Sequence, residues 1–333
     1  MLKLKLLAPL GGVGPGLLAS ALIGGAAGLV ATWTSGPIML FALLFGIALN
    51  FLGKIERFDR GISFTSKFVL RLGVALLGLK ITLGDVVSLG WGPLLLVVAA
   101  ITLTILSATA VARCMGFDAR FGVLSGGATA ICGASAAMAL SAALPNHPMK
   151  ERATLFTVVG VSALSTLAMI VYPMIAQATG LDPRAAGVFL GTTIHDVAQV
   201  VGAGYSLSQQ TGDVATVVKL MRVAMLVPVV VFAVVLSRRQ AGETQGPRPP
   251  LLPGFAVGFA LLVVVNSTGW LPGVVAKTGS DLSRWLLVAS IAGIGMKTQL
   301  KELITVGFKP VALMIGETVF LAALTLALMH WLV

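Results

Sequence analysis

Long runs of apolar residues, separated by short polar segments, fill this chain from one end to the other. They recur from Leu17 to Leu332, and many reach the roughly 20 residues that an α-helix needs to cross a bilayer. The pattern predicts an all-α integral membrane protein with about 11 transmembrane helices. We place these helices at 14–34, 37–53, 63–79, 91–112, 121–143, 153–178, 185–205, 215–236, 251–271, 282–296 and 309–332.

The composition agrees with this pattern and excludes several classes of protein. Of the 333 residues 57% are hydrophobic and only 11% are charged, whereas a globular chain carries roughly 25% charged residues. A cytosolic enzyme, a nucleic-acid-binding module and a disulfide-stapled secreted domain are therefore not expected. We treat 1–333 as a single transmembrane domain surrounded by the lipid bilayer, with 237–250 (SRRQAGETQGPRPP) as a flexible cytoplasmic linker.

The distribution of basic residues predicts the orientation in the membrane. The net charge is +11, and the basic residues lie mainly in the short segments between apolar runs, so no nucleic-acid partner is expected. With a cytoplasmic N-terminus, fifteen of the 23 Lys and Arg residues fall on the cytoplasmic side and six on the other, Lys150, Arg152 and Lys219 among the six. Cytoplasmic loops collect Lys and Arg, so the bias favours this orientation, with the C-terminus on the opposite side.

Two segments separated by 217 residues resemble each other. Gly78–Pro93 (GLKITLGDVVSLGWGP) and Gly295–Pro310 (GMKTQLKELITVGFKP) share two Gly, one Lys, one Leu and one Pro. Chance agreement between apolar segments is the alternative, but the shared Lys and acidic positions are not explained by hydropathy. Seven of the predicted spans lie between the two copies, so the copies have opposite orientations, as in transporters with inverted repeats. The repeat halves then run about 37–178 and 185–333.

Two further segments are too rich in glycine and polar residues to be ordinary spans. Residues 125–141 read SGGATAICGASAAMALS, and residues 191–206 read GTTIHDVAQVVGAGYS. In the second, Thr192, His195 and Gln199 share one helical face, while Asp196 lies about 100° away. Ionisable residues at membrane depth are costly and usually functional. A His195–Asp196 pair that only locks two helices is the alternative.

Interrupted helices in these segments would create a place for an anion. The N-terminus of a second half-helix exposes N–H groups and carries partial positive charge. Arg71 and Arg222 lie inside predicted spans and can grip an oxyanion through two parallel hydrogen bonds, unless their side chains extend to the membrane surface. The residues we expect to contact the anion are Arg71, Arg222, Cys132, Gly133, Ser135, Thr192, Thr193 and Gln199.

Three ionisable side chains are candidates for ion coupling. Asp196 and Glu317 are intramembrane carboxylates, and either could carry a proton or neutralise an arginine. His195 titrates in a useful range. Enzymatic signatures are weak: no motif indicates a metal or ATP, and Ser135, His195 and Asp196 make a poor triad because adjacent helical residues point about 100° apart. We expect no catalytic residues, no metal and no cofactor.

At His195, Asp196, Val197, Ala198 and Gln199, together with Ile131–Ser135 and KLMRVAM around Arg222, the chain resembles the YeiH-type sulfate-exporter family of bacterial membrane proteins. Members often carry Glu where this chain has the shorter Asp196. That family is similar to the sodium/proton antiporters and bile-acid symporters, with inverted units and crossed, broken helices. The resemblance implies a bacterial inner-membrane carrier with a periplasmic C-terminus, and it allows a homodimer.

These observations support one leading hypothesis and two alternatives. The first is a secondary transporter that exports sulfate or an organosulfonate by alternating access, coupled to H⁺ or Na⁺. The second is a monovalent cation/proton antiporter in which Asp196 and Glu317 bind the ion. The third, a membrane scaffold, predicts no flux, and the lack of large loops argues against it.

Overall fold

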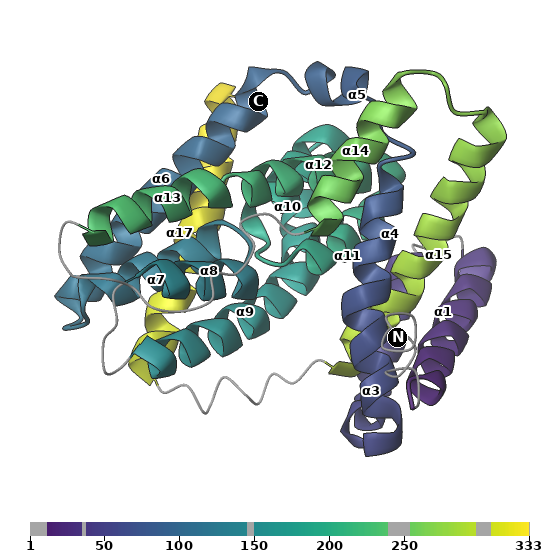
Figure 1. Ribbon diagram of the computed structural model, residues 1–333, viewed down its shortest axis with the longest axis horizontal. Helices are drawn as coiled ribbons and strands as arrows, with labels where there is room; N and C mark the ends of the chain where they lie inside the picture. Colours follow the sequence, from purple (N-terminus) through teal and green to yellow (C-terminus); the bar gives the residue numbers. More distant parts are fainter. Residues whose placement is uncertain (1–11, 35–37, 145–149, 239–253, 298–307, 333) are drawn as a thin grey trace, which may run out of the picture. The chain divides into compact units, whose positions relative to one another are not determined.

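The protein is helical throughout the part of the chain that the computed structural model describes, which comprises residues 12–34, 38–144, 150–238, 254–297 and 308–332 (Figure 1). No strand occurs in these residues. The helices group into two compact units, and the chain passes between them more than once. The first unit contains residues 1–88 and 254–298, and the second contains 89–253 and 299–333. Both predicted repeat halves therefore contribute to each unit.

The first unit is built from the beginning of the chain and one later segment. Its elements are α1 (Gly14–Thr34), α2 (Ile38–Ala48), η2 (Asn50–Lys54), α3 (Glu56–Phe64), η3 (Thr65–Val69), α4 (Leu70–Leu77), α5 (Leu83–Ser88), α14 (Gly254–Ser267) and α15 (Gly273–Lys297). The α3–η3–α4 segment runs without a loop from Glu56 to Leu77 and includes one π-helical turn. Helix α15 packs along this segment and also against α2.

Glycines at equivalent positions of the two sequence copies both pack against the backbone of another helix of the first unit. Gly78 packs against the Phe259 carbonyl of α14, and Gly295, 217 residues later, packs against the Leu43 carbonyl of α2. Ser283 donates to the carbonyl of Gly73, and Gly279 meets Leu79, so α15 runs antiparallel to α4. The helices that lead into the two copies, α4 and α15, thus run in opposite directions; residues 298–307 of the second copy lie outside the described residues.

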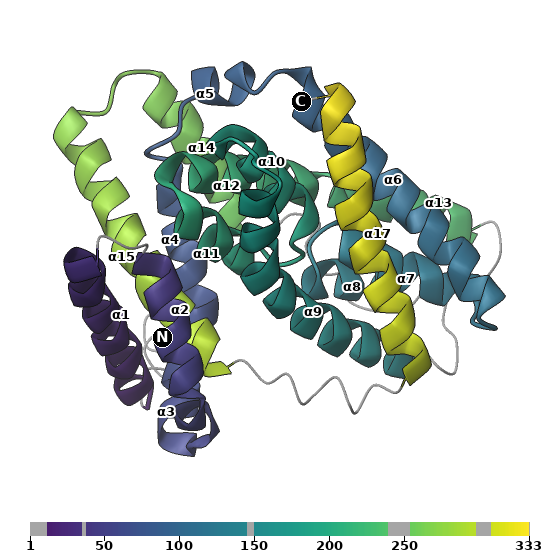
Figure 2. The same ribbon diagram turned by 180° about the vertical axis from the view of Figure 1, so that it is seen from behind.

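The second unit holds the glycine-rich segments. Its elements are α6 (Trp91–Cys114), α7 (Ala119–Ala130), α8 (Ala134–Ala143), α9 (Lys150–Ala178), α10 (Pro183–Thr193), α11 (Val197–Leu207), α12 (Gln209–Ala224), α13 (Leu226–Arg238) and α17 (Phe308–Leu332). Figure 2 shows the same helices from behind, with α17 in yellow beside α6 in blue. The predicted linker 237–250 falls almost entirely outside the described residues.

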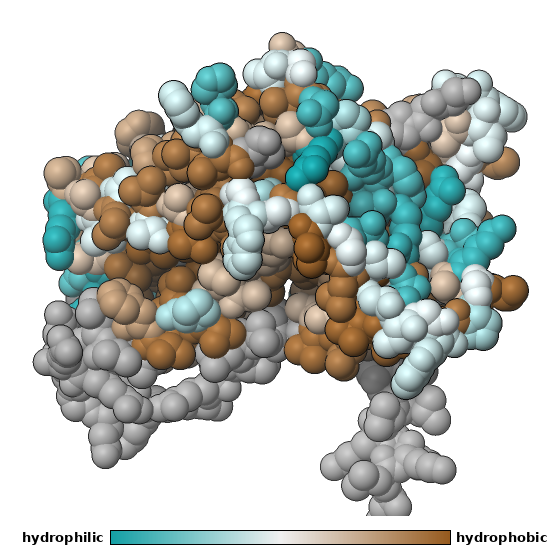
Figure 3. Space-filling view, turned by 90° about the horizontal axis from the view of Figure 1, so that it is seen from above, coloured by the Kyte–Doolittle hydropathy of each residue, from teal (hydrophilic) through white to brown (hydrophobic). Residues whose placement is uncertain are grey.

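The outer surface carries many large apolar side chains. Figure 3 shows them as broad brown areas on one face. Leu18, Leu22 and Leu29 on α1 and Leu106 on α6 are each at least 60% exposed, which suits contact with lipid rather than water. Five helices are long and apolar enough to cross a membrane: Gly14–Thr34, Trp91–Cys114, Arg152–Ala178, Gln209–Ala233 and Phe308–Leu332. An all-α membrane protein is thus confirmed, while two of the expected spans have a different form.

Candidate functional site: the junction of two helical hairpins

The first glycine-rich segment folds back on itself instead of crossing as one helix. The Asp118 side chain caps the start of α7 by accepting from the backbone N–H of Arg120. Helix α7 ends at Ala130, and Gly133, with φ +65°, turns the chain into α8. Gly127 of α7 then lies against the Leu140 side chain of α8. Residues 13 positions apart in one helix would be about 20 Å apart, so α7 and α8 form an antiparallel hairpin.

The second segment, α10 and α11, has the same form. Asp182 caps α10 by accepting from two backbone N–H groups, and Asp196 caps α11 by accepting from the N–H of Ala198. Gly187 of α10 and Gly204 of α11 both lie beside the same turn of α12, between Thr211 and Ala215. The outer ends of α10 and α11 are therefore at one level, which makes this segment a second hairpin with its tip at Ile194–Asp196.

Two buried cations of α12 join the tips of the hairpins. Lys219 Nζ donates to the Ile131 carbonyl at 2.7 Å and to the Ile194 carbonyl at 3.0 Å. Arg222, one turn later on the same face, donates to carbonyls of both tips at 2.7–3.0 Å. Both side chains are at most 1% exposed. The junction between the hairpins is thus made by side chains reaching backbone oxygens.

All the hydrogen-bonding capacity of Arg222 is used in this junction. Nε donates to Ala130, Nη1 to Gly191 and Ile194, and Nη2 to Thr129 and Ala130. A guanidinium has five N–H groups, and five bonds are formed. These carbonyl groups lie at the C-terminal ends of α7 and α10. The last carbonyl groups of a helix have no N–H partner within that helix. Arg222 therefore neutralises two helix ends and offers no further N–H to an anion in this arrangement.

The net charge at the junction depends on Glu317, whose carboxyl group binds Thr129. The C-terminal ends of α7 and α10 bring about −0.5 each, and the N-terminal ends of α8 and α11 bring about +0.5 each. With Lys219 and Arg222 positive and Asp196 ionised, the total is about +1 when Glu317 is protonated and about 0 when it is ionised. The N-terminal end of α8 has no carboxylate cap, because its N-cap residue, Gly133, has no side chain. The cluster is also accessible there, since Ser135 is exposed and Ala134 half-buried.

His195 connects the hairpin tips to α17. Its Nδ1 lies 3.0 Å from the Thr129 carbonyl and its Nε2 lies 3.1 Å from Thr318 Oγ1. A carbonyl oxygen only accepts, so Nδ1 carries a proton. The Thr318 hydroxyl also lies 2.8 Å from the Met314 carbonyl, so its one proton is donated either to that carbonyl or to a neutral Nε2. The ring is completely buried, so it links the two hairpin tips to α17 out of contact with solvent.

Glu317 lies one residue from Thr318 and reaches the first hairpin. Its two carboxyl oxygens accept from Ser125 Oγ at 2.6 Å and from Thr129 Oγ1 at 3.0 Å. Its side chain is 4% exposed and borders a hollow of about 380 Å³ between α6 and α17. Thr129 therefore links the carboxyl group of Glu317, through its hydroxyl, to Arg222 and His195, through its carbonyl.

The remaining predicted residues occupy different places. Ser135 donates to Cys132 at the tip, and the Thr193 hydroxyl donates within its own helix to Phe189. The Gln199 amide donates to Thr166, while its carbonyl oxygen and the Thr192 hydroxyl are buried without a partner among the described residues. Arg71 differs from the others, because it is an exposed residue of α4 in the first unit.

The sequence interpretation missed Lys219, which we assigned to an outer loop and which is instead fully buried in α12. Its position three residues before Arg222 in an apolar run was the available signal. It also missed the hydroxyl partners Ser125, Thr129, Ser165, Thr166 and Thr318. Among the described residues, no three His, Cys, Asp or Glu side chains are grouped to hold a metal.

A second internal repeat becomes visible only with the hairpins in place. At a spacing of 64 residues, Asp118, Arg120, Gly127 and Thr129 of the first hairpin correspond to Asp182, Arg184, Gly191 and Thr193 of the second. Each Asp is the N-cap of its hairpin, and each Gly packs closely in the last turns of the first half-helix. The two hairpins are therefore related in sequence as well as in form.

Comparison with known proteins identifies the family. The family model described as conserved hypothetical protein 698 matches residues 15–314. A UPF0324 membrane protein of Chlorobaculum tepidum is 53% identical over 320 residues, covering 96% of this chain and 89% of the relative. The UPF0324 membrane protein TauZ of Paracoccus denitrificans is 49% identical over 319 residues, covering 95% and 94%. The chain therefore belongs to the UPF0324 family of membrane proteins, which agrees with the resemblance found in the sequence.

Proposed function

We propose that this member of the UPF0324 family is a secondary transporter for a small oxyanion such as sulfate or an organosulfonate. The observation that carries the proposal is the cluster of buried cations and helix ends where the hairpin tips meet, which has an excess positive charge when Glu317 is protonated. Among the described residues, no side chain caps the N-terminus of α8, and Ser135 at this end is exposed. An anion bound there would supply the missing negative charge.

Different groups at the hairpin tips have different roles in binding the anion. Backbone N–H groups at the start of α8 and the Ser135 hydroxyl act as donors to the anion. Lys219 and Arg222 provide the positive field and hold the tips together, and the unpartnered Thr192 hydroxyl is a further donor. Two inward-pointing hairpins that close one site from opposite directions suit alternating access, because either hairpin can open while the other remains closed. We propose this division with the inner membrane as the site of action.

Glu317 is the proposed coupling residue, with His195 as its neighbour. An ionised Glu317 lowers the net positive charge near the tips, whereas a protonated one leaves that charge for the anion. Protonation therefore favours anion binding, and the two move together. Export, which the resemblance implies, then requires an outward anion gradient that exceeds the inward driving force on the proton. Na⁺ at the same carboxylate would couple in the same sense.

Counterflow of labelled sulfate and methanesulfonate in proteoliposomes tests the proposal. We expect saturable uptake in the wild type and a loss of at least tenfold in Lys219→Gln, because one charge at the junction is removed. Arg284→Gln, an exposed position in the first unit, is the matched control and should retain uptake. Absence of anion flux together with a Na⁺- or K⁺-dependent proton flux would instead support the antiporter, with Asp196 and Glu317 binding the cation.

A further inference from the structure

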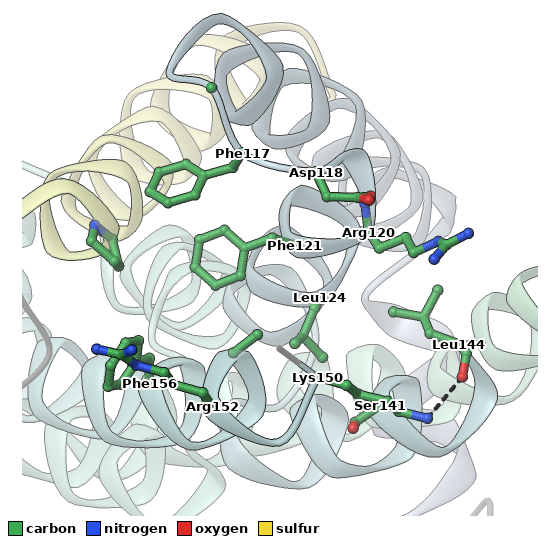
Figure 4. Close-up of a pocket in the computed structure, with 13 residues that line it drawn as sticks. Phe117, Asp118, Arg120, Phe121, Leu124, Ser141, Leu144, Lys150, Arg152 and Phe156 are labelled. Carbon is green, nitrogen blue, oxygen red and sulfur yellow. Dashed lines mark hydrogen bonds between the residues drawn. The ribbon is translucent and has the colours of Figure 1, made fainter. Parts of the chain in front are cut away.

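A second pocket lies at the open end of the first hairpin, away from its tip. It has a volume of about 280 Å³ and is bounded by the α6–α7 loop, the beginning of α7, the end of α8 and the beginning of α9 (Figure 4). Pro310 at the start of α17 completes it. All these segments belong to the second unit. Because helices begin and end here, the pocket is at the boundary between the bilayer and water.

The walls of this pocket are apolar. Aromatic and aliphatic side chains line it, with the rings of Phe117 and Phe121 packed at a centroid distance of 5.0 Å. Leu124 and Leu144 come from the two arms of the hairpin, and Phe156 comes from α9. A small hydrated anion gains nothing from such walls, whereas a hydrocarbon chain does.

The rim of the pocket carries an excess of positive charge. Arg120, Lys150 and Arg152 surround it, and among the described lining residues Asp118, which caps α7, is the one carboxylate. Lys150 Nζ donates to the Leu144 carbonyl at 2.8 Å, which places its charge at the rim, as Figure 4 shows. The Arg152 guanidinium lies 5.0 Å from the centre of the Phe156 ring, where it bridges the charged rim and the apolar wall.

We propose that this pocket binds an anionic phospholipid, with the phosphate at the basic rim and part of an acyl chain against the aromatic wall. Basic pockets between transmembrane helices recognise anionic lipid headgroups in this way. The lipid would rest on both arms of the first hairpin and on α9. The site is separate from the hairpin tips and does not depend on which ion the protein transports.

Native mass spectrometry of the full-length protein tests the proposal, with phosphatidylglycerol and phosphatidylcholine of equal chain length added in competition. We expect the wild type to retain phosphatidylglycerol preferentially. Arg120→Gln combined with Arg152→Gln should weaken retention by about tenfold or more, because two headgroup contacts are lost. Arg57→Gln combined with Arg113→Gln removes the same charge from exposed positions outside the pocket and should leave retention unchanged.

A second variant guards against a folding defect in the first. Phe117→Ala keeps every charge and shortens the apolar wall, so it should reduce retention of long-chain phosphatidylglycerol more than that of a short-chain form. Equal losses in both double variants would overturn the proposal, since the effect would be general attraction. Equal retention of the two lipids, or displacement of phosphatidylglycerol by millimolar sulfate or inorganic phosphate, would overturn it as well.

Discussion

The Arg222 guanidinium, together with Lys219, joins the two hairpin tips, and its sequence context reveals only part of this role. Arg222 and His195 attract attention because ionisable residues inside apolar spans are costly. The sequence cannot show that Arg222 spends all five N–H groups on carbonyls, because those oxygens become available only where α7 and α10 end. Lys219 escaped notice for a simpler reason: the polar residues before it resembled a loop. Charge inside a span was predictable, but its partners were not.

Replacing Arg222 tests whether it holds the tips or grips the anion. Arg222→Gln should lower the free energy of unfolding by about 2 kcal/mol or more, because buried carbonyls lose their donors. Arg222→Lys keeps the charge with fewer donors and should recover part of the stability and some transport. Thermal unfolding in detergent, alongside anion counterflow, measures both. Normal stability in Arg222→Gln with transport abolished would assign the guanidinium to the anion instead.

Glu317 should make anion binding depend on pH. Protonation removes a negative charge near the tips, so the affinity for sulfate should rise as the pH falls. Glu317→Gln mimics the protonated carboxyl group and should bind with a higher affinity that no longer varies with pH. Asp281→Asn removes an exposed carboxylate of the first unit and serves as the control. An unchanged pH profile in Glu317→Gln would move the coupling role to His195 or Asp196.

At the scale of elements, the central difference is between a crossing helix and a hairpin of the same length. Residues 121–143 are numerous enough to cross a bilayer once, and hydropathy gives the same signal for two half-helices that enter and return. Both segments are interrupted, at 131–133 and 194–196. The first break contains Gly133, whereas the second contains no glycine, and the polar pair His195–Asp196 was its signal in the sequence. The direction that the chain takes after each break was not predictable, because it depends on contacts such as that of Gly127 with Leu140.

Close helix packing by glycine gives a prediction for the first hairpin. A Cβ at Gly122 would approach backbone atoms of Ala108 and Thr109 on α6, which cannot move aside as a side chain can. Gly122→Ala should therefore destabilise the protein by about 1–3 kcal/mol. Gly316→Ala on α17 is the matched control, because its Cβ would meet nothing within 4 Å. Equal melting temperatures for the two variants would show that α6 and α7 are not this close.

For the whole molecule, the two hairpins must open toward opposite sides of the membrane. Helix α9 begins beside the open end of the first hairpin and ends just before the second. Its 29 residues span about 43 Å, more than the hydrocarbon core. Lys150 and Arg152 then lie on the same side of the membrane as Arg120, whereas the spans predicted from the sequence put them on the opposite side. With this change more basic residues gather on the side where we expect the N-terminus, and labelling decides whether that side is the cytoplasm.

Labelling of single cysteines with a membrane-impermeant maleimide tests this topology directly. In a parent carrying Cys114→Ser and Cys132→Ala, we expect Arg113→Cys and Arg152→Cys to react from the same side, and Thr179→Cys from the other. All three positions are exposed. A continuous span at 121–143 makes the reverse prediction: Arg152→Cys would react opposite Arg113→Cys, and Thr179→Cys on the same side as Arg113→Cys. Detergent-permeabilised vesicles, in which all three should react, separate an inaccessible thiol from one on the far side.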